Sequence, residues 1–165
     1  MKWHESMIEK AKGFIEKGES LQPVLFLKQK GRISIVHVGR FANDKDGLSF
    51  ILHVAVQAEN PDEYLYMTEA YVKIFDQKDG ADVALGKLFV DGALQVSQVP
   101  SAKECITVLF GDRKAEKLGT IIFEKKDGST VFEPIQWLED GEMKGRFTGL
   151  RNQDFFYDHN SEKSV

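Results

Sequence analysis

Apolar residues recur at steps of three and four positions near the start of the chain, and this spacing predicts an amphipathic helix from Lys2 to Lys17. Gly18 follows the last periodic position, where glycine readily adopts the left-handed conformation that ends many helices. The residues expected on the buried face are Trp3, Met7, Ala11, Phe14 and Ile15.

A second helix is predicted between Asn43, which we expect to cap the first turn together with Asp46, and Pro61, which ends it. Its apolar stripe is wide, and we expect the buried residues to be Leu48, Ile51, Leu52, Ala55 and Val56. A narrow polar line remains on this helix, formed by Ser49, His53 and Gln57.

Short runs rich in β-branched and aromatic residues predict the strands. The runs Pro23–Lys28 and Arg32–Val38 are separated by a Gly31-containing turn and predict a hairpin, and Tyr64–Phe75 is apolar enough on both faces for a central strand. Residues 77–103 are predicted to form a loop or a small excursion. Four further strands are expected as a meander, at Cys105–Phe110, Thr120–Lys125, Val131–Leu138 and Lys144–Thr148.

These elements predict an α+β protein. We expect a two-layer arrangement in which two amphipathic helices pack against a mostly antiparallel sheet of five to seven strands. The 165 residues contain no internal repeat or linker, so residues 1–158 are expected to form one domain and residues 159–165 a polar tail.

Composition and charge narrow the function classes. The formal net charge of -4 makes nucleic acid and anionic membrane surfaces poor partners. Cys105 is the single cysteine, which fits a reducing compartment, and we expect a cytoplasmic protein. There is no basic leader followed by an apolar run, and no apolar stretch of about 18 residues, so neither a signal peptide nor a membrane span is expected.

Common catalytic and cofactor motifs are missing from the sequence. It contains no P-loop, dinucleotide fingerprint, G-x-S-x-G elbow, H-E-x-x-H pair or C-x-x-C pair. The acidic run before Gly47 superficially resembles a calcium loop, but alignment on that glycine places Ala42 and Leu52 at ligand positions. No cofactor and no metal are therefore expected.

Three titratable residues are the candidates for catalysis. Glu69 lies within an otherwise apolar strand, where a carboxylate needs a compensating partner or serves as a general acid or base. A cross-strand Lys or Arg is the structural alternative. His37, on the Ile33 and Ile35 face of its strand, and His53, on the polar line of the second helix, are the conceivable catalytic partners.

Two other features favour structural roles. Cys105 lies in an apolar strand, where free cysteine behaves as a small buried hydrophobe. The aromatic cluster Phe155, Phe156 and Tyr157 either closes one end of the core or presents a patch to a partner.

The order of these features resembles a group of uncharacterised bacterial and phage proteins known as a domain of unknown function. The resemblance covers roughly residues 1–135. It depends on the hairpin around Gly31, the Asp44–Lys45 pair that opens a helix, the strand Thr68–Tyr71, and the Pro100, Ser101 and Lys103–Glu104 lead into a strand. That group typically has Trp where this chain has Tyr71, and the spacing from 77 to 99 departs from it. The resemblance implies a compact α+β fold and no known activity, substrate or cofactor.

Two classes of function remain open. One is a non-catalytic binding or regulatory module with an unidentified protein partner, and this is the class we favour because no catalytic constellation is visible. The other is a small-ligand-binding protein or an enzyme with a pocket between the second helix and the sheet, near Glu69. Self-association into a homo-oligomer through a free sheet edge is compatible with both.

Overall fold

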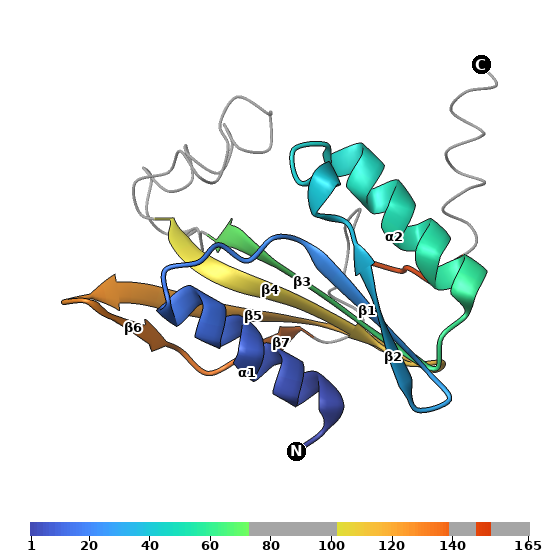
Figure 1. Cartoon of the computed structure of the whole chain (residues 1–165), viewed down its shortest axis with the longest axis horizontal. Coiled ribbons are helices and arrows are strands. Elements are labelled where there is room, and N and C mark those ends of the chain that lie inside the picture. Colours follow the sequence, from blue (N-terminus) through green and yellow to red (C-terminus); the bar gives the residue numbers. More distant parts are fainter. Residues whose placement is uncertain (73–101, 139–147, 153–165) are drawn as a thin grey trace, which may run out of the picture.

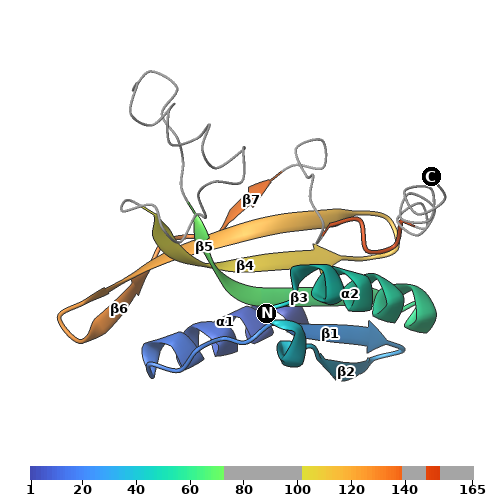
Figure 2. The ribbon, with the colours of Figure 1, turned by 90° about the horizontal axis from the view of Figure 1, so that it is seen from above.

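One antiparallel sheet organises the chain. The structure is a computed structural model that describes residues 1–72, 102–138 and 148–152. The strand order is β2-β1-β3-β4-β5-β6, with β7 also paired to β5, and every pairing is antiparallel (Figures 1 and 2). The elements are α1 (Trp3–Glu16), β1 (Val24–Gln29), β2 (Arg32–His37), the 3-10 helix η1 (Gly39–Phe41), α2 (Lys45–Glu59), β3 (Glu63–Val72), β4 (Lys103–Gly111), β5 (Glu116–Lys126), β6 (Ser129–Phe132) and β7 (Gln136–Leu138).

The two helices lie on opposite faces of the sheet, above and below the strands in Figure 1. The α+β class, with two helices and an antiparallel sheet of the expected size, is confirmed. The layer arrangement differs from the expected one, because the described chain has a helix layer on each face. The reason lies in β3, which is apolar on both faces: Leu65 and Met67 face α1, while Tyr64 and Tyr66 face α2.

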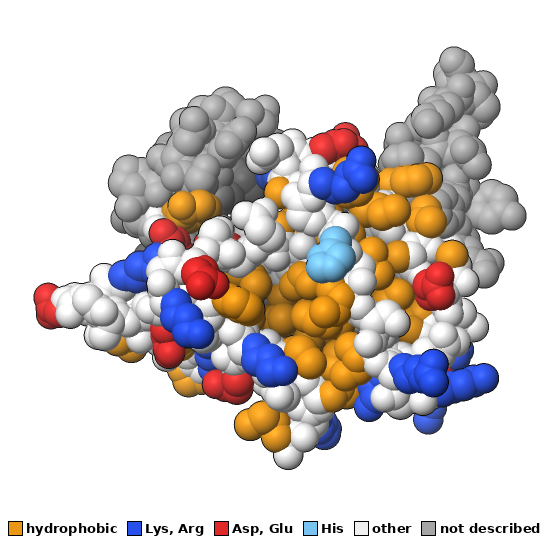
Figure 3. Space-filling model, in the orientation of Figure 1, with side chains coloured by type: hydrophobic (Ala, Val, Ile, Leu, Met, Phe, Trp, Pro, Cys, Tyr) orange, Lys and Arg blue, Asp and Glu red, His pale blue; other side chains and the backbone are white. Residues whose placement is uncertain are grey.

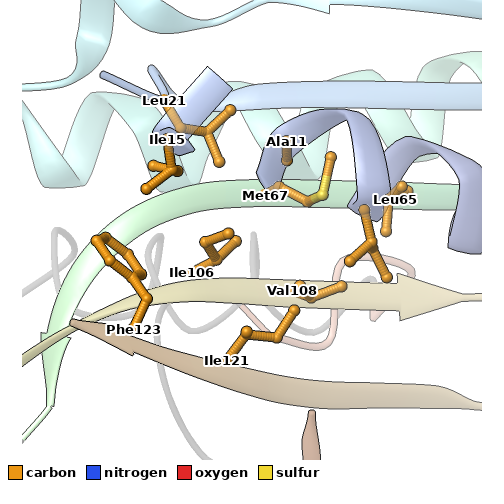
Figure 4. Packing of buried hydrophobic residues seen from close by; sticks show 10 residues of the cluster. Ala11, Ile15, Leu21, Leu65, Met67, Ile106, Val108, Ile121 and Phe123 are labelled. Carbon is orange, nitrogen blue, oxygen red and sulfur yellow. The ribbon is translucent and has the colours of Figure 1, made fainter. Parts of the chain in front are cut away.

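The core on the α1 face packs one side of the helix against three central strands (Figure 4). Its side chains interdigitate, and each large aliphatic residue buried there contributes about 1.5–3 kcal/mol relative to exposure. The buried members of this core are Ile8, Ala11, Ile15, Leu21, Leu65, Met67, Ile106, Val108, Ile121 and Phe123.

The first helix ends as predicted, but its buried face is rotated from the expected one. Gly18 has φ +78°, and its amide donates to Ile15 O at 3.0 Å. The buried residues of α1 are His4, Ile8, Ala11 and Ile15, whereas Phe14 is 47% exposed. In the first two turns the buried stripe is therefore shifted by one position, from Trp3 and Met7 to His4 and Ile8. Trp3, Met7 and Phe14 lie beside the buried stripe and are not part of it.

The second helix also differs in detail. Its N-cap is Asp44, whose carboxylate accepts from the amide of Gly47 at 2.9 Å, and not Asn43. Asn60 ends the helix in the left-handed conformation, directly before the predicted terminator Pro61. The predicted polar line is partly buried, since Ser49 is 3% and His53 2% exposed.

The C-terminal meander departs most from prediction. The run predicted as one strand at Val131–Leu138 is two strands, β6 and β7, separated around Pro134, which cannot donate a ladder hydrogen bond. Trp137 lies over Gly119 on β5, where a Cβ would approach its ring to 2.8 Å. Thr148 is not in a strand, and the rest of the predicted strand 144–148, most of 77–103 and the Phe155–Tyr157 cluster are outside the described residues.

Residues 148–152 pack on the α2 face of the sheet, where the Glu116 carboxylate and the Arg151 side chain hold them. Glu116 accepts from the amides of Gly149 at 2.6 Å and Leu150 at 3.2 Å, and also from the hydroxyl of Tyr64. Arg151 donates to Asn60 Oδ1 at 3.1 Å and to the Pro61 carbonyl, and Leu150 is fully buried. This segment closes the end of the α2-face core.

Candidate functional site

Glu69 has a structural partner, and that partner is a backbone amide. Its Oε1 accepts from Leu21 N at 2.5 Å, while its own amide donates to Leu21 O at 3.4 Å. These two bonds extend the β1–β3 pairing beyond Val24 into the connection that follows α1. In the described part of the sheet, the residue opposite Glu69 on β4 is Ile106, so the expected cross-strand cation is not at that position.

His53 is a buried helix residue on the other side of the sheet. Its Nδ1 lies 2.7 Å from the carbonyl oxygen of Ser49 one turn earlier, and because that oxygen can only accept, Nδ1 is the donor. The helix carrying His53 packs on the Tyr64 and Tyr66 face, whereas Glu69 shares the opposite face with Met67. The sheet therefore separates these two candidate residues.

His37 is exposed at the end of β2 on the same face as Glu69. In the register it is opposite Val24, which is in turn opposite Met67 on β3. Two interstrand spacings, about 10 Å, therefore separate His37 from the β3 backbone. The structure does not bring the three predicted residues together, and the Glu69 carboxylate is already hydrogen-bonded.

Metal and thiol chemistry find no further support in the described residues. Among them, no group of three His, Cys, Asp or Glu side chains is placed to hold a metal ion. Cys105 is buried, as predicted, and burial raises the pKa of its thiol. A group in this state is a poor nucleophile.

An apolar groove of about 560 Å³ lies between α1 and the β1–β2 hairpin. Figure 3 shows hydrophobic side chains gathered on this face, over the region between α1 and the hairpin. Phe14, Ile33 and Ile35 are 47%, 40% and 53% exposed, so large apolar surface here meets solvent. Further lining residues are Met7, Lys10, Ala11, Glu19, Ser20, Leu21, Gln22, Val24, Phe26 and Met67.

The groove borders an open sheet edge. In the described part of the chain, β2 is the last strand on its side, and no described strand pairs with its outer edge. Edge strands are usually protected by proline, by bulges or by several charges, but β2 has only Arg32 as a charged residue. Ile33 and Ile35 lie on the α1 face of this strand, so the edge and the groove form one continuous surface.

A second cleft, of about 670 Å³, lies at the N-terminal end of α1. We call it the His4 cleft; its lining residues are Lys2, Trp3, His4, Lys28, Asp62, Glu63, Phe110, Asp112, Arg113 and Lys114. The His4 ring stacks on Phe110 with centroids 4.0 Å apart. Trp3 Nε1 donates to Glu63 Oε2 at 2.9 Å, which fixes the indole beside the stacked pair.

His4 is the most unusual polar residue of this cleft. It is 4% exposed, and its buried Nδ1 has no hydrogen-bond partner among the described residues. Burial lowers the pKa of His4, and the charge of Lys117 lowers it further, against smaller opposing effects from Glu5 and Glu63. Its imidazole is therefore neutral near pH 7.

His4 is not among the residues predicted for a site, although the sequence carries one indication that it is buried. His4, Ile8, Ala11 and Ile15 are spaced by four, three and four positions, which is a helical stripe that begins with the histidine. Its stacking on Phe110, 106 positions later in the chain, depends on the strand register and has no local signature.

Comparisons with protein-family models, with curated protein sequences and with solved structures found no match. The resemblance to a domain of unknown function therefore stays a prediction. Within the described residues, no helix combines the length and the apolar character needed to cross a bilayer.

Proposed function

We propose that this protein is a non-catalytic binding module that takes up an extended segment of a partner protein along β2 and the adjoining apolar groove. The observation that carries the proposal is the continuity of an open strand edge with exposed apolar side chains at Phe14, Ile33 and Ile35. The lone buried thiol of Cys105 supports the expectation of a cytoplasmic location.

The geometry of β2 defines the backbone of the ligand. Unpaired amides and carbonyls along a strand edge are best satisfied by another extended chain, as in β-augmentation. Ile33 and Ile35 are two positions apart on the face toward α1, so the added strand would place alternate side chains beside them. The ligand is thus an extended segment with apolar residues at alternate positions.

The charges at the two ends of the groove favour one orientation of the bound segment. Within the described part of the chain, neither the ammonium of Lys30 nor the guanidinium of Arg32 has a carboxylate within 4.0 Å. Both lie at the hairpin turn, while Glu19 lines the groove at its other end. A partner segment with carboxylates beside the hairpin turn complements this distribution.

The alternative of an enzyme or small-ligand pocket near Glu69 receives less support. The Glu69 carboxylate accepts a hydrogen bond from the Leu21 amide. His37 lies two strands away on β2, and His53 lies on α2 at the other face of the sheet. Glu69 lines neither the apolar groove nor the His4 cleft. A binding module is the function that this arrangement favours.

The test uses a fluorescent synthetic peptide with three valines alternating with threonines, followed by two glutamates. We expect saturable binding, measured by fluorescence anisotropy, and loss of binding when the peptide is N-methylated on the edge that faces β2. Ile35→Lys should weaken binding at least about fivefold, because it removes apolar contact and adds a charge. Phe50→Lys is the matched control, since Phe50 is 50% exposed but lies on α2.

Two results would refute the proposal. If N-methylated and unmodified peptides bind equally, the strand edge is not used. If the protein is a dimer that Ile35→Lys dissociates, a second copy and not a separate partner occupies the edge. Light scattering after size-exclusion chromatography distinguishes this second case.

A further inference from the structure

We propose that the His4 cleft is a binding site for a planar organic anion, such as an aromatic carboxylate. The cleft shares no lining residue with the apolar groove, so this site is independent of the proposed peptide-binding function. Its volume of about 670 Å³ falls within the range of small-molecule sites.

The three carboxylates of the cleft each accept hydrogen bonds from other groups of the protein. Asp62 accepts from Lys30 N at 2.9 Å and from Arg113, and Asp112 Oδ1 accepts from the amides of Lys114 and Ala115. Glu63 accepts from the Trp3 indole. These bonds hold the acids in place, and the Arg113 guanidinium balances the charge of Asp62.

The lysines of the cleft are in the opposite situation. Within the described residues, no carboxylate lies within 4.0 Å of the ammonium groups of Lys2, Lys28 or Lys114. The Lys28 ammonium is 5.7 Å from the centroid of the Trp3 ring, so cationic and aromatic surfaces adjoin. The polar contacts that remain open in the cleft therefore favour an anion.

Aromatic surface supplies the second recognition element. Trp3 and Phe110 are half-buried, and the His4 ring lies against Phe110 with an interplanar angle of 27°. A flat ligand ring can stack on this cluster while its acidic group reaches a lysine. His4 lines the same cleft, and its buried Nδ1 has no hydrogen-bond partner among the described residues.

The experiment titrates the full chain with benzoate and follows the two indole N–H signals by NMR, with Trp137→Phe to assign them. We expect benzoate to shift the Trp3 signal saturably. Acetate, which lacks the ring, and benzamidine, which carries the opposite charge, should produce no saturable shift at the same ionic strength. These two probes separate stacking from charge.

Lysine variants locate the anion. Lys28→Met and Lys114→Met should each weaken benzoate binding about threefold, the scale of a solvent-exposed ion pair. Lys45→Met, on the other face of the sheet at the start of α2, should leave it unchanged. All three lysine side chains are charged surface groups, and a thermal melt of each variant checks that the fold is retained.

Three outcomes would overturn the inference. One is the absence of a saturable shift up to about 10 mM benzoate, which corresponds to binding too weak for a built site. Another is an equal response to benzamidine, which would mean apolar contact without charge selection. The third is an equal loss for Lys45→Met and Lys28→Met, which would mean a general charge effect.

Discussion

Glu116 is the residue whose replacement tests the fold most directly. Three donors converge on its carboxylate: the Gly149 amide at 2.6 Å, the Leu150 amide at 3.2 Å and the Tyr64 hydroxyl. Tyr64 is 2% exposed, and burial together with the Glu116 charge raises the pKa of its phenol. The phenol thus remains a donor throughout the ordinary pH range.

Glu116→Gln keeps the shape of the side chain but exchanges one acceptor oxygen for an NH₂ donor. At least one of the three donors then loses its acceptor in a largely buried place. Hydrogen bonds to a charged group contribute about 1.5–3 kcal/mol each, and we expect a loss of unfolding free energy of this size. Among the described segments, residues 148–152 should become the first to open.

Urea unfolding followed by tryptophan fluorescence measures this loss. The matched control is Glu124→Gln on the same strand, because among the described residues the Glu124 carboxylate makes an exposed ion pair with Lys126 at 3.1 Å. A double-mutant cycle with Tyr64→Phe isolates the hydroxyl–carboxylate bond and should show a coupling of about 0.5 kcal/mol or more. The reasoning fails if Glu116→Gln costs no more than Glu124→Gln.

Two further predictions concern packing and pH. Gly111→Ala should destabilise the protein by about 1–3 kcal/mol or more, because the added Cβ would lie 2.2 Å from the Tyr64 ring. Gly13→Ala is the matched control in the same urea assay: its added Cβ meets nothing within 4 Å, so it should stabilise α1 by about 0.5–1 kcal/mol. Since burial lowers the pKa of His4, the unfolded chain binds the proton more readily, so stability should fall as the pH drops below about 6.5. His4→Phe should reduce that slope between about pH 7 and pH 5 in thermal melts, and an unchanged slope would contradict the assignment.

Elements that depend on short-range chemistry could be predicted from the sequence. The hairpin turn has Lys30 at φ 49° and Gly31 at φ 78°, and the later turn at Asp127 and Gly128 has the same conformation. Both were visible as glycine-containing turns between apolar runs. The termination of α1 at Gly18 has the same local origin.

Features that depend on register could not be predicted in this way. The partner of Glu69 is the amide of Leu21, 48 positions earlier, and nothing in the local pattern distinguishes this bond from a bond to a cross-strand cation. The layer arrangement could not be predicted either. An amphipathic stripe shows that a helix packs against the sheet, but it does not show against which face. The Val131–Leu138 run forms two strands because Pro134, between β6 and β7, cannot donate a ladder hydrogen bond, and its apolar pattern alone does not show this break.

The two candidate sites have one structural origin, which is the rotation of α1 about its axis. Because His4, Ile8 and Ala11 face the sheet, the apolar residues to either side of this stripe cannot be fully buried by it. Phe14 is left exposed beside the hairpin, and Trp3 is left half-buried at the rim of the His4 cleft. Apolar surface left in contact with water contributes nothing to the stability of the fold. On α1 such surface borders the two cavities, at Phe14 and at Trp3, and this location favours a binding role for these side chains over a packing role.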